Sequence, residues 1–189
     1  MAQVVEEAKA NDAIYATAEF IGYSLWVVPR ADAGRELADA ISECAARLQT
    51  PPFLPHMTLL GGIVGIQEED AVAKTAQVAD AIHALSAKVC AVTSKELLYF
   101  QCVFALLELT NELSSAHLAA KQTFGRFQDT EFMPHISLVY GDLTREQKQQ
   151  LIAELGPRFD GMRVQLDHLQ LWNTSGPVAN WQLVREFQL

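Results

Sequence analysis

Residues 53–62 have the sequence FLPHMTLLGG, and residues 132–141 have the matching sequence FMPHISLVYG. The phenylalanine, proline, histidine, leucine and final glycine are identical in the two segments, and only Gly61 and Tyr140 differ in kind. In each segment a histidine stands two residues before a hydroxyl side chain, within an apolar run. Two such histidines facing each other can act as general acid and general base on one substrate.

Strand geometry gives each repeated segment a polar face and an apolar face, because successive side chains of a strand point to opposite sides. His56 and Thr58 therefore share one face, and His135 and Ser137 share the equivalent face of the second segment. We expect the two strands to lie side by side at a central cleft, related by a pseudo-twofold axis. Their hydroxyl groups would then be placed to bind the oxygens of a phosphate.

Hydrophobic periodicity around these segments predicts alternating strands and helices. Strands are expected over 22–28, 54–62, 87–94, 97–109, 135–140, 163–172 and 180–187, and helices over 32–49, 68–85, 112–127 and 144–155. Thr144 and Gln147 have the spacing of a capping box, and Gly156-Pro157 is expected to end the helix that they begin. The order predicts an α+β, bilobal fold with two mostly antiparallel sheets, outer helices and a central cleft.

Length and composition indicate one domain with a sizeable core, because the 189 residues are 50% hydrophobic. We expect a single bilobal domain over residues 19–189, preceded by a tail or short added helix over 1–18. The net charge of −9 argues against binding to long nucleic acid, which depends on Lys and Arg contacts to phosphates. Residues 1–11 do not have the pattern of a signal peptide, and no apolar run is long enough to cross a membrane, so we expect a cytoplasmic protein without a membrane partner. We also expect a monomer.

The cysteines, and the histidines outside the repeat, do not have the spacing of a metal site, and we expect neither a metal nor a cofactor. Cys44, Cys90 and Cys102 are widely separated and are expected to be buried, reduced thiols. The histidines outside the repeat are expected to be surface or helix residues: His83, His117 and His168.

The paired HxTL and HxSL segments resemble the signature of the two-histidine (2H) phosphoesterase superfamily, which has the LigT-like fold. Residues 23–29, 100–104 and 133–144 are also similar to the cyclic phosphodiesterases of plants and yeast. The similarity covers most of residues 20–187.

This resemblance implies a metal-independent enzyme that acts on small cyclic phosphates. Such an enzyme would hydrolyse ADP-ribose 1″,2″-cyclic phosphate to ADP-ribose 1″-phosphate, and nucleoside 2′,3′-cyclic phosphates to 2′-phosphates. His56 and His135 match the family's catalytic histidines, and Thr58 and Ser137 match its phosphate-binding hydroxyls. The residues do not decide which histidine is the base, although His135 is slightly favoured for that role.

Three aromatic residues match positions that would contact the substrate, namely Tyr140 at the cleft mouth, Trp26 and Phe100. Gln101 is a weaker candidate, because strand alternation places it opposite Phe100. Two other functions remain open. One is a phosphodiesterase of the same superfamily that acts on RNA ends or on 2′,5′-linked oligonucleotides, and the other is a nucleotide-binding module without catalysis.

Overall fold

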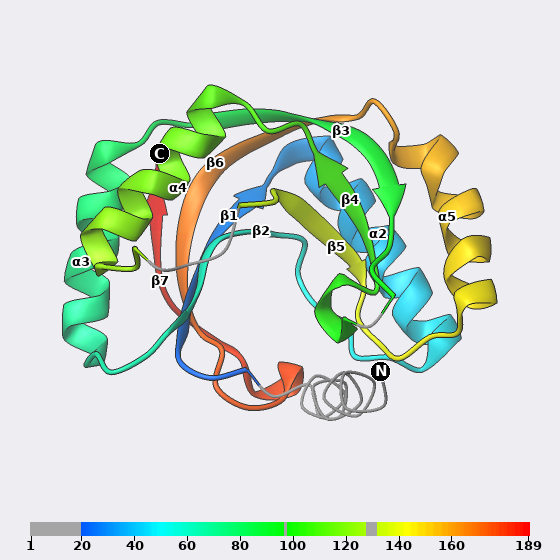
Figure 1. Cartoon of the computed structure of the whole chain (residues 1–189), viewed down its shortest axis with the longest axis horizontal. Coiled ribbons are helices and arrows are strands. Elements are labelled where there is room, and N and C mark those ends of the chain that lie inside the picture. The colour runs from blue at the N-terminus through cyan, green and yellow to red at the C-terminus, as the bar shows by residue number, and fades with distance from the viewer. Residues whose placement is uncertain (1–19, 97, 128–131) are drawn as a thin grey trace, which may run out of the picture.

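The computed structural model describes residues 20–96, 98–127 and 132–189 (Figure 1), so the tail expected over 1–18 lies outside the described part. The order of elements confirms the expected alternation of strands and helices. It runs β1 (Tyr23–Pro29), α2 (Ala31–Leu48), β2 (Met57–Ile63), α3 (Glu68–Ala81), β3 (Leu85–Thr93), η1 (Tyr99–Gln101), β4 (Val103–Leu107), α4 (Asn111–Phe124), β5 (His135–Val139), α5 (Arg145–Phe159), β6 (Arg163–Asn173), η2 (Val178–Asn180) and β7 (Gln182–Gln188).

The seven strands of the described residues form one curved sheet in the order β1-β2-β5-β4-β3-β6-β7, and β1 also pairs with β6. All of these pairings are antiparallel. Strand β6 closes the ring, because its first residues pair with β3 while later residues pair with β1 and β7. The α+β antiparallel fold is therefore confirmed, and the structure joins the two expected sheets through shared strands.

The helices lie on the outside of the curved sheet, as expected. Helices α3 and α4 pack on each other at one side of the molecule, and α2 and α5 lie at the other side (Figure 1). Helix α4 contacts β2, whereas α2 contacts β5, so each repeated strand is backed by a helix. Met57 and Ile136, on the apolar faces of the repeated strands, are 0% exposed. None of the helices in the described residues is long and apolar enough to cross a membrane.

The strand predicted over 97–109 is shorter in the structure. Residues Tyr99–Gln101 form a 3-10 turn, and the strand itself begins at Val103. Two carbonyl groups of this turn accept hydrogen bonds that a strand does not need: the amide of Lys95 donates to the carbonyl of Gln101 (3.0 Å), and the hydroxyl of Ser137 donates to the carbonyl of Phe100 (2.8 Å). These bonds stabilise the turn in place of a strand.

Helix α5 begins with the predicted capping box, in which Thr144 and Gln147 exchange side-chain and backbone hydrogen bonds. The helix does not end at Gly156-Pro157 but continues to Phe159, which is fully buried. Pro157 cannot donate the helical hydrogen bond to the carbonyl four residues earlier, and its ring crowds that carbonyl, so the continued helix carries a cost. The burial of Phe159 offsets this cost.

The cysteines differ in exposure, although all three are free. Cys44 and Cys102 are buried as expected. Cys90 is exposed, because the side chains of β3 alternate between the core and the solvent and Cys90 follows the buried Val89.

Candidate active site

The two repeated segments are neighbours in the sheet. Strands β2 and β5 pair antiparallel, with Met57 opposite Ile136. These two residues occupy equivalent positions of the repeat. Two identical positions facing each other across an antiparallel pair is the arrangement that a local twofold axis produces, as the sequence predicted.

This register places the four polar residues of the repeat together on one face. In an antiparallel pair centred on Met57 and Ile136, His56 falls opposite Ser137 and Thr58 falls opposite His135. The two histidines are thus diagonal neighbours, and diagonal positions in such a pair lie about 7–8 Å apart. That separation leaves room for a phosphate group between the two rings.

Each imidazole is held by the same main-chain contact. Nδ1 of His56 donates to the carbonyl of Leu54 at 2.6 Å, and Nδ1 of His135 donates to the carbonyl of Met133 at 2.9 Å. Leu54 and Met133 are again equivalent in the repeat. Because each Nδ1 carries the proton, Nε2 of each neutral ring has the lone pair that can accept a proton.

Trp26 supports His56 rather than offering an open surface. Its ring stacks on His56 with centroids 3.6 Å apart and planes 10° apart, and Trp172 stacks on its opposite face at 4.4 Å. Both faces of the indole are therefore covered, and only its edge is available to the cavity. In the other half of the site, Phe104 contacts His135 edge-on at 5.1 Å.

Tyr140 lies inside the site and not at its mouth, since it is only 3% exposed. Its hydroxyl is 3.4 Å from Nε2 of His56, and its ring stacks on Phe53 with centroids 3.7 Å apart. Burial raises the pKa of Tyr140, so the phenol stays protonated and can donate a hydrogen bond toward His56.

The 3-10 turn η1 brings two consecutive side chains to the site. Phe100 and Gln101 both line the cavity, because a 3-10 turn does not alternate side chains as a strand does. The sequence prediction that Gln101 points away from Phe100 depended on a strand at this place. Ser137 fixes the turn by donating its hydroxyl proton to the carbonyl of Phe100.

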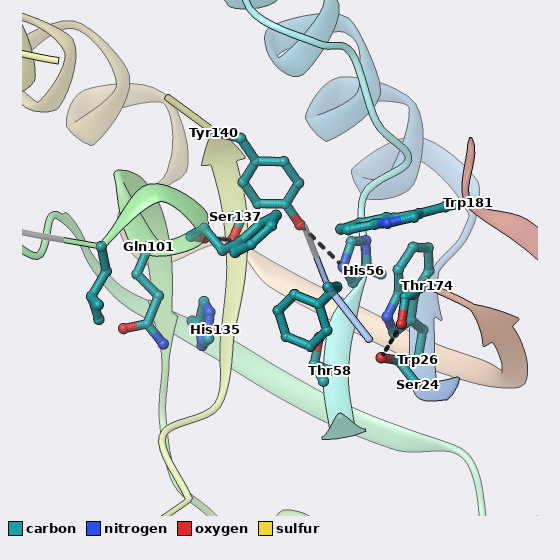
Figure 2. Close-up of a pocket in the computed structure, with 13 residues that line it drawn as sticks. Ser24, Trp26, His56, Thr58, Gln101, His135, Ser137, Tyr140, Thr174 and Trp181 are labelled. Atoms are coloured by element: carbon teal, nitrogen blue, oxygen red, sulfur yellow. Dashed lines mark hydrogen bonds between the residues drawn. The ribbon is translucent and has the colours of Figure 1, made fainter. Parts of the chain in front are cut away.

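A cavity of about 400 Å³, within the range of small-molecule sites, connects these residues (Figure 2). All seven residues expected from the sequence line it: His56, Thr58, His135, Ser137, Tyr140, Trp26 and Phe100. The lining also includes residues that the sequence analysis missed: Phe20, Ser24, Leu98, Thr174 and Trp181. Strand alternation from Trp26 could have identified Ser24, whereas no local pattern indicates Trp181.

The two histidines differ in their electrostatic environment. Burial lowers the pKa of His56 from 6.5 to about 4, with the carbonyl of Leu54 opposing the shift and the charge of His135 adding to it. Burial also lowers the pKa of His135; the carbonyl of Met133 opposes this shift, and the nearby cationic Lys95 adds to it. Both imidazoles are therefore neutral at pH 7 when the cavity holds no ligand. The described residues contain no group of three or more His, Cys, Asp or Glu side chains that could hold a metal ion.

Comparison with known proteins agrees with this geometry. Residues 21–189 match the family described as cyclic phosphodiesterase-like protein. The chain is 30% identical to the cyclic phosphodiesterase of Arabidopsis thaliana over 155 residues, which cover 80% of this chain and 84% of that protein.

Solved structures show the same fold at low sequence identity. LigT of E. coli in its apo form superposes with a TM-score of 0.61 at 12% identity, covering 90% of this chain and 98% of LigT. The protein TT0787 of Thermus thermophilus gives a TM-score of 0.60 at 19% identity, covering 89% of this chain and 98% of TT0787. The chain therefore belongs to the cyclic phosphodiesterase-like family of the 2H phosphoesterase superfamily, and it is a phosphodiesterase enzyme.

Proposed function

We propose that this enzyme hydrolyses nucleoside 2′,3′-cyclic phosphates to 2′-phosphates, and ADP-ribose 1″,2″-cyclic phosphate to ADP-ribose 1″-phosphate, by metal-independent acid-base catalysis. One observation carries the proposal. Two imidazoles from equivalent segments, each oriented by a main-chain carbonyl, share a single cavity with the hydroxyl groups of Thr58 and Ser137.

The unequal histidines suggest a division of labour. The base must be neutral and the acid must be protonated, so the ring with the more strongly lowered pKa suits the base. His56 is that ring, and Tyr140 lies beside its Nε2, where the phenol can also hold the attacking water. His135 then acts as the acid. This assignment is the reverse of the one slightly favoured by the sequence, which carries no information on burial.

In the proposed reaction, His56 takes a proton from water as the water oxygen attacks phosphorus. The bond from phosphorus to the 3′ oxygen breaks, and His135 gives its Nε2 proton to that oxygen, leaving the 2′-phosphate. His135 must therefore enter the reaction as the imidazolium, and the lowered pKa of this residue places that form on the acidic side of neutrality. Attack and departure are roughly in line, which requires the base and the acid on opposite sides of phosphorus. The diagonal placement of His56 and His135 across the β2–β5 pair supports this arrangement.

The hydroxyls stabilise the charge that develops on the non-bridging oxygens. Thr58 is opposite His135 and faces the cavity. Ser137 donates to the carbonyl of Phe100 in this structure, so it must turn its proton toward the phosphate when substrate binds. We therefore expect Thr58 to contribute more to catalysis than Ser137.

A small nucleotide agrees with the other properties of the chain. E. coli LigT has been crystallised in complexes with 3′-AMP and with ATP, which shows that a protein of this fold binds nucleotides. A cavity of about 400 Å³ and a net charge of −9 favour a small ligand over a long RNA. Free thiols, including the exposed Cys90, suit the reducing cytoplasm, where we propose that the enzyme acts as a monomer.

Phosphorus NMR of the products tests this proposal. The panel comprises 2′,3′-cyclic mononucleotides, ADP-ribose 1″,2″-cyclic phosphate, and an oligonucleotide ending in a 2′,3′-cyclic phosphate. We expect 2′-phosphates from the mononucleotides, slower reaction of the oligonucleotide, and losses of roughly 100- to 10,000-fold in His56→Asn and in His135→Asn. The half-buried His168, outside the cavity lining, provides the matched control His168→Asn. Near-normal turnover by either site variant would overturn the two-histidine mechanism.

A further inference from the structure

A pair of hydroxyl groups lies at one end of the cavity. Ser24 and Thr174 both line it, and their oxygens are 3.0 Å apart. Figure 2 shows this pair beside Trp26, across the cavity from His135 and Gln101. Neither hydroxyl belongs to the repeated segments, and the proposed acid-base steps use neither.

The direction of the hydrogen bonds in this pair is fixed by a carbonyl group. Thr174 Oγ1 donates to the carbonyl of Gly22 at 3.0 Å, and a carbonyl can only accept. The one hydroxyl proton of Thr174 is thereby used. The proton in the contact between the two side chains must come from Ser24, so the oxygen of Ser24 is left with lone pairs and no proton to offer. Ser24 can only accept a hydrogen bond from a ligand.

Gly61 leaves space in front of this acceptor. A Cβ atom at Gly61 would lie 3.7 Å from the oxygen of Ser24 and 3.4 Å from Cγ2 of Thr58. A larger side chain would therefore extend into the region that Ser24 and Thr58 border. The equivalent position of the second segment carries Tyr140, which fills its own part of the site. Gly61 therefore leaves space beside Ser24, whereas Tyr140 fills the equivalent space in the other half of the site.

Aromatic rings border the same end of the cavity. Phe20 and Trp181 contact each other edge-on at 6.2 Å, and Trp181 contacts the Trp26 ring at 5.6 Å. A flat heterocycle is the kind of group that such rings accommodate. The acceptor on Ser24 requires that this heterocycle carry a hydrogen-bond donor.

We propose that this end of the cavity binds the base of a nucleoside 2′,3′-cyclic phosphate, and that Ser24 accepts a hydrogen bond from the exocyclic amino group of cytosine or adenine. Uracil and hypoxanthine carry an oxo group at the same position, and two acceptors would then face each other. The inference rests on the proposed function, which it extends to the choice of base.

The test compares substrates that differ in this amino or oxo group: cytidine with uridine 2′,3′-cyclic phosphate, and adenosine with inosine 2′,3′-cyclic phosphate. We expect kcat/KM to favour the amino member about tenfold in the unchanged enzyme. Ser24→Ala should reduce the ratio to within about twofold. Thr174→Val frees the proton of Ser24, so the ratio should fall further and turn toward the oxo member. The exposed Ser42 provides the control Ser42→Ala, which should keep the original ratio.

Because each ratio is measured within one variant, a general loss of activity or folding does not imitate the result. Calorimetric titration with 2′-CMP and 2′-UMP measures the same preference without turnover. Equal ratios in the unchanged enzyme and both variants would overturn the role of Ser24, while turnover of all substrates would leave the proposed function intact. An absence of turnover combined with a Ser24-dependent preference for 2′-CMP would instead contradict the proposed function and support this subsite.

Discussion

Replacing His56 by Asn should make the protein lose less stability when the pH is lowered. His56 is 5% exposed, and its pKa in the folded protein is about 4, against an ordinary value of 6.5. Between these two values the unfolded chain binds a proton at this residue and the folded protein does not. Acidification therefore favours unfolding across this window.

The size of the effect follows from the shift of the pKa. One unit corresponds to about 1.4 kcal/mol, so a fall from 6.5 to about 4 corresponds to about 3 kcal/mol of unfolding free energy. This stability is fully present above pH 6.5 and is lost as the pH falls to 4. Asparagine does not titrate, and its amide can still donate toward the carbonyl of Leu54, so the variant loses the proton-linked stability together with the stacking on Trp26.

Urea denaturation followed by circular dichroism at pH 7, 6, 5 and 4, in buffers without phosphate, measures this difference. His56→Asn should be less stable than the unchanged protein at pH 7, because it loses the stacking on Trp26. The difference in unfolding free energy between the two proteins should shrink by about 3 kcal/mol as the pH falls to 4. Carboxylates contribute equally to both proteins, and His83→Asn, at an exposed site, is the matched control. A gap that is constant from pH 7 to pH 4 would show that His56 is not held neutral by burial.

Three further predictions concern catalysis. The pH profile of kcat/KM should be bell-shaped and displaced to the acidic side. The rate should fall below about pH 4, where His56 becomes protonated, and above the pKa of His135, which lies below 6.5. Steady-state kinetics from pH 3.5 to 8 measures this profile, and an optimum above pH 7 would contradict it. Trp26→Leu removes the ring that stacks on His56 and should lower kcat about tenfold or more with little change in KM, whereas Trp26→Phe should recover part of the rate. Lys148→Met removes the ammonium that donates to the carbonyls of residues 95 and 96 at 2.9 and 3.0 Å. Urea denaturation should show a loss of about 1–3 kcal/mol in unfolding free energy. KM should also rise, because residues 95 and 96 lead into the turn that carries Phe100.

The meeting of the repeated segments at one cavity could be predicted because their signal is local. Alternation along a strand places His56 with Thr58, and the repeat itself supplies the partner strand in the matching orientation. The apolar residues between them, Met57 and Ile136, are pushed to the core by the same alternation, and the structure buries both completely. Pattern and packing agree here, so the sequence was sufficient.

Features that depend on distant contacts could not be predicted in this way. The turn at Phe100 is held by a serine 37 residues later, which donates a hydrogen bond to its carbonyl. The ring of strands closes because β1 pairs with β6, which lies near the other end of the chain. The extension of α5 beyond Pro157 depends on a pocket in the core that receives Phe159. In each case the contact that changes the element comes from a distant part of the chain, so the local sequence of that element does not indicate it.

Departures from exact symmetry in the repeat explain how the two histidines can differ in pKa. A site with perfect twofold symmetry would give both imidazoles the same pKa, and neither would be favoured as the base. The symmetry is broken around the repeat by unlike neighbours: Phe53 stacks on Tyr140, whereas its equivalent, Phe132, stacks on His117 with centroids 4.2 Å apart. Tyr140 in turn lies against His56 and helps to bury it, while Gly61 leaves the equivalent place open. The one position that differs in kind between the two segments can therefore supply both the directionality of proton transfer and the space for the substrate.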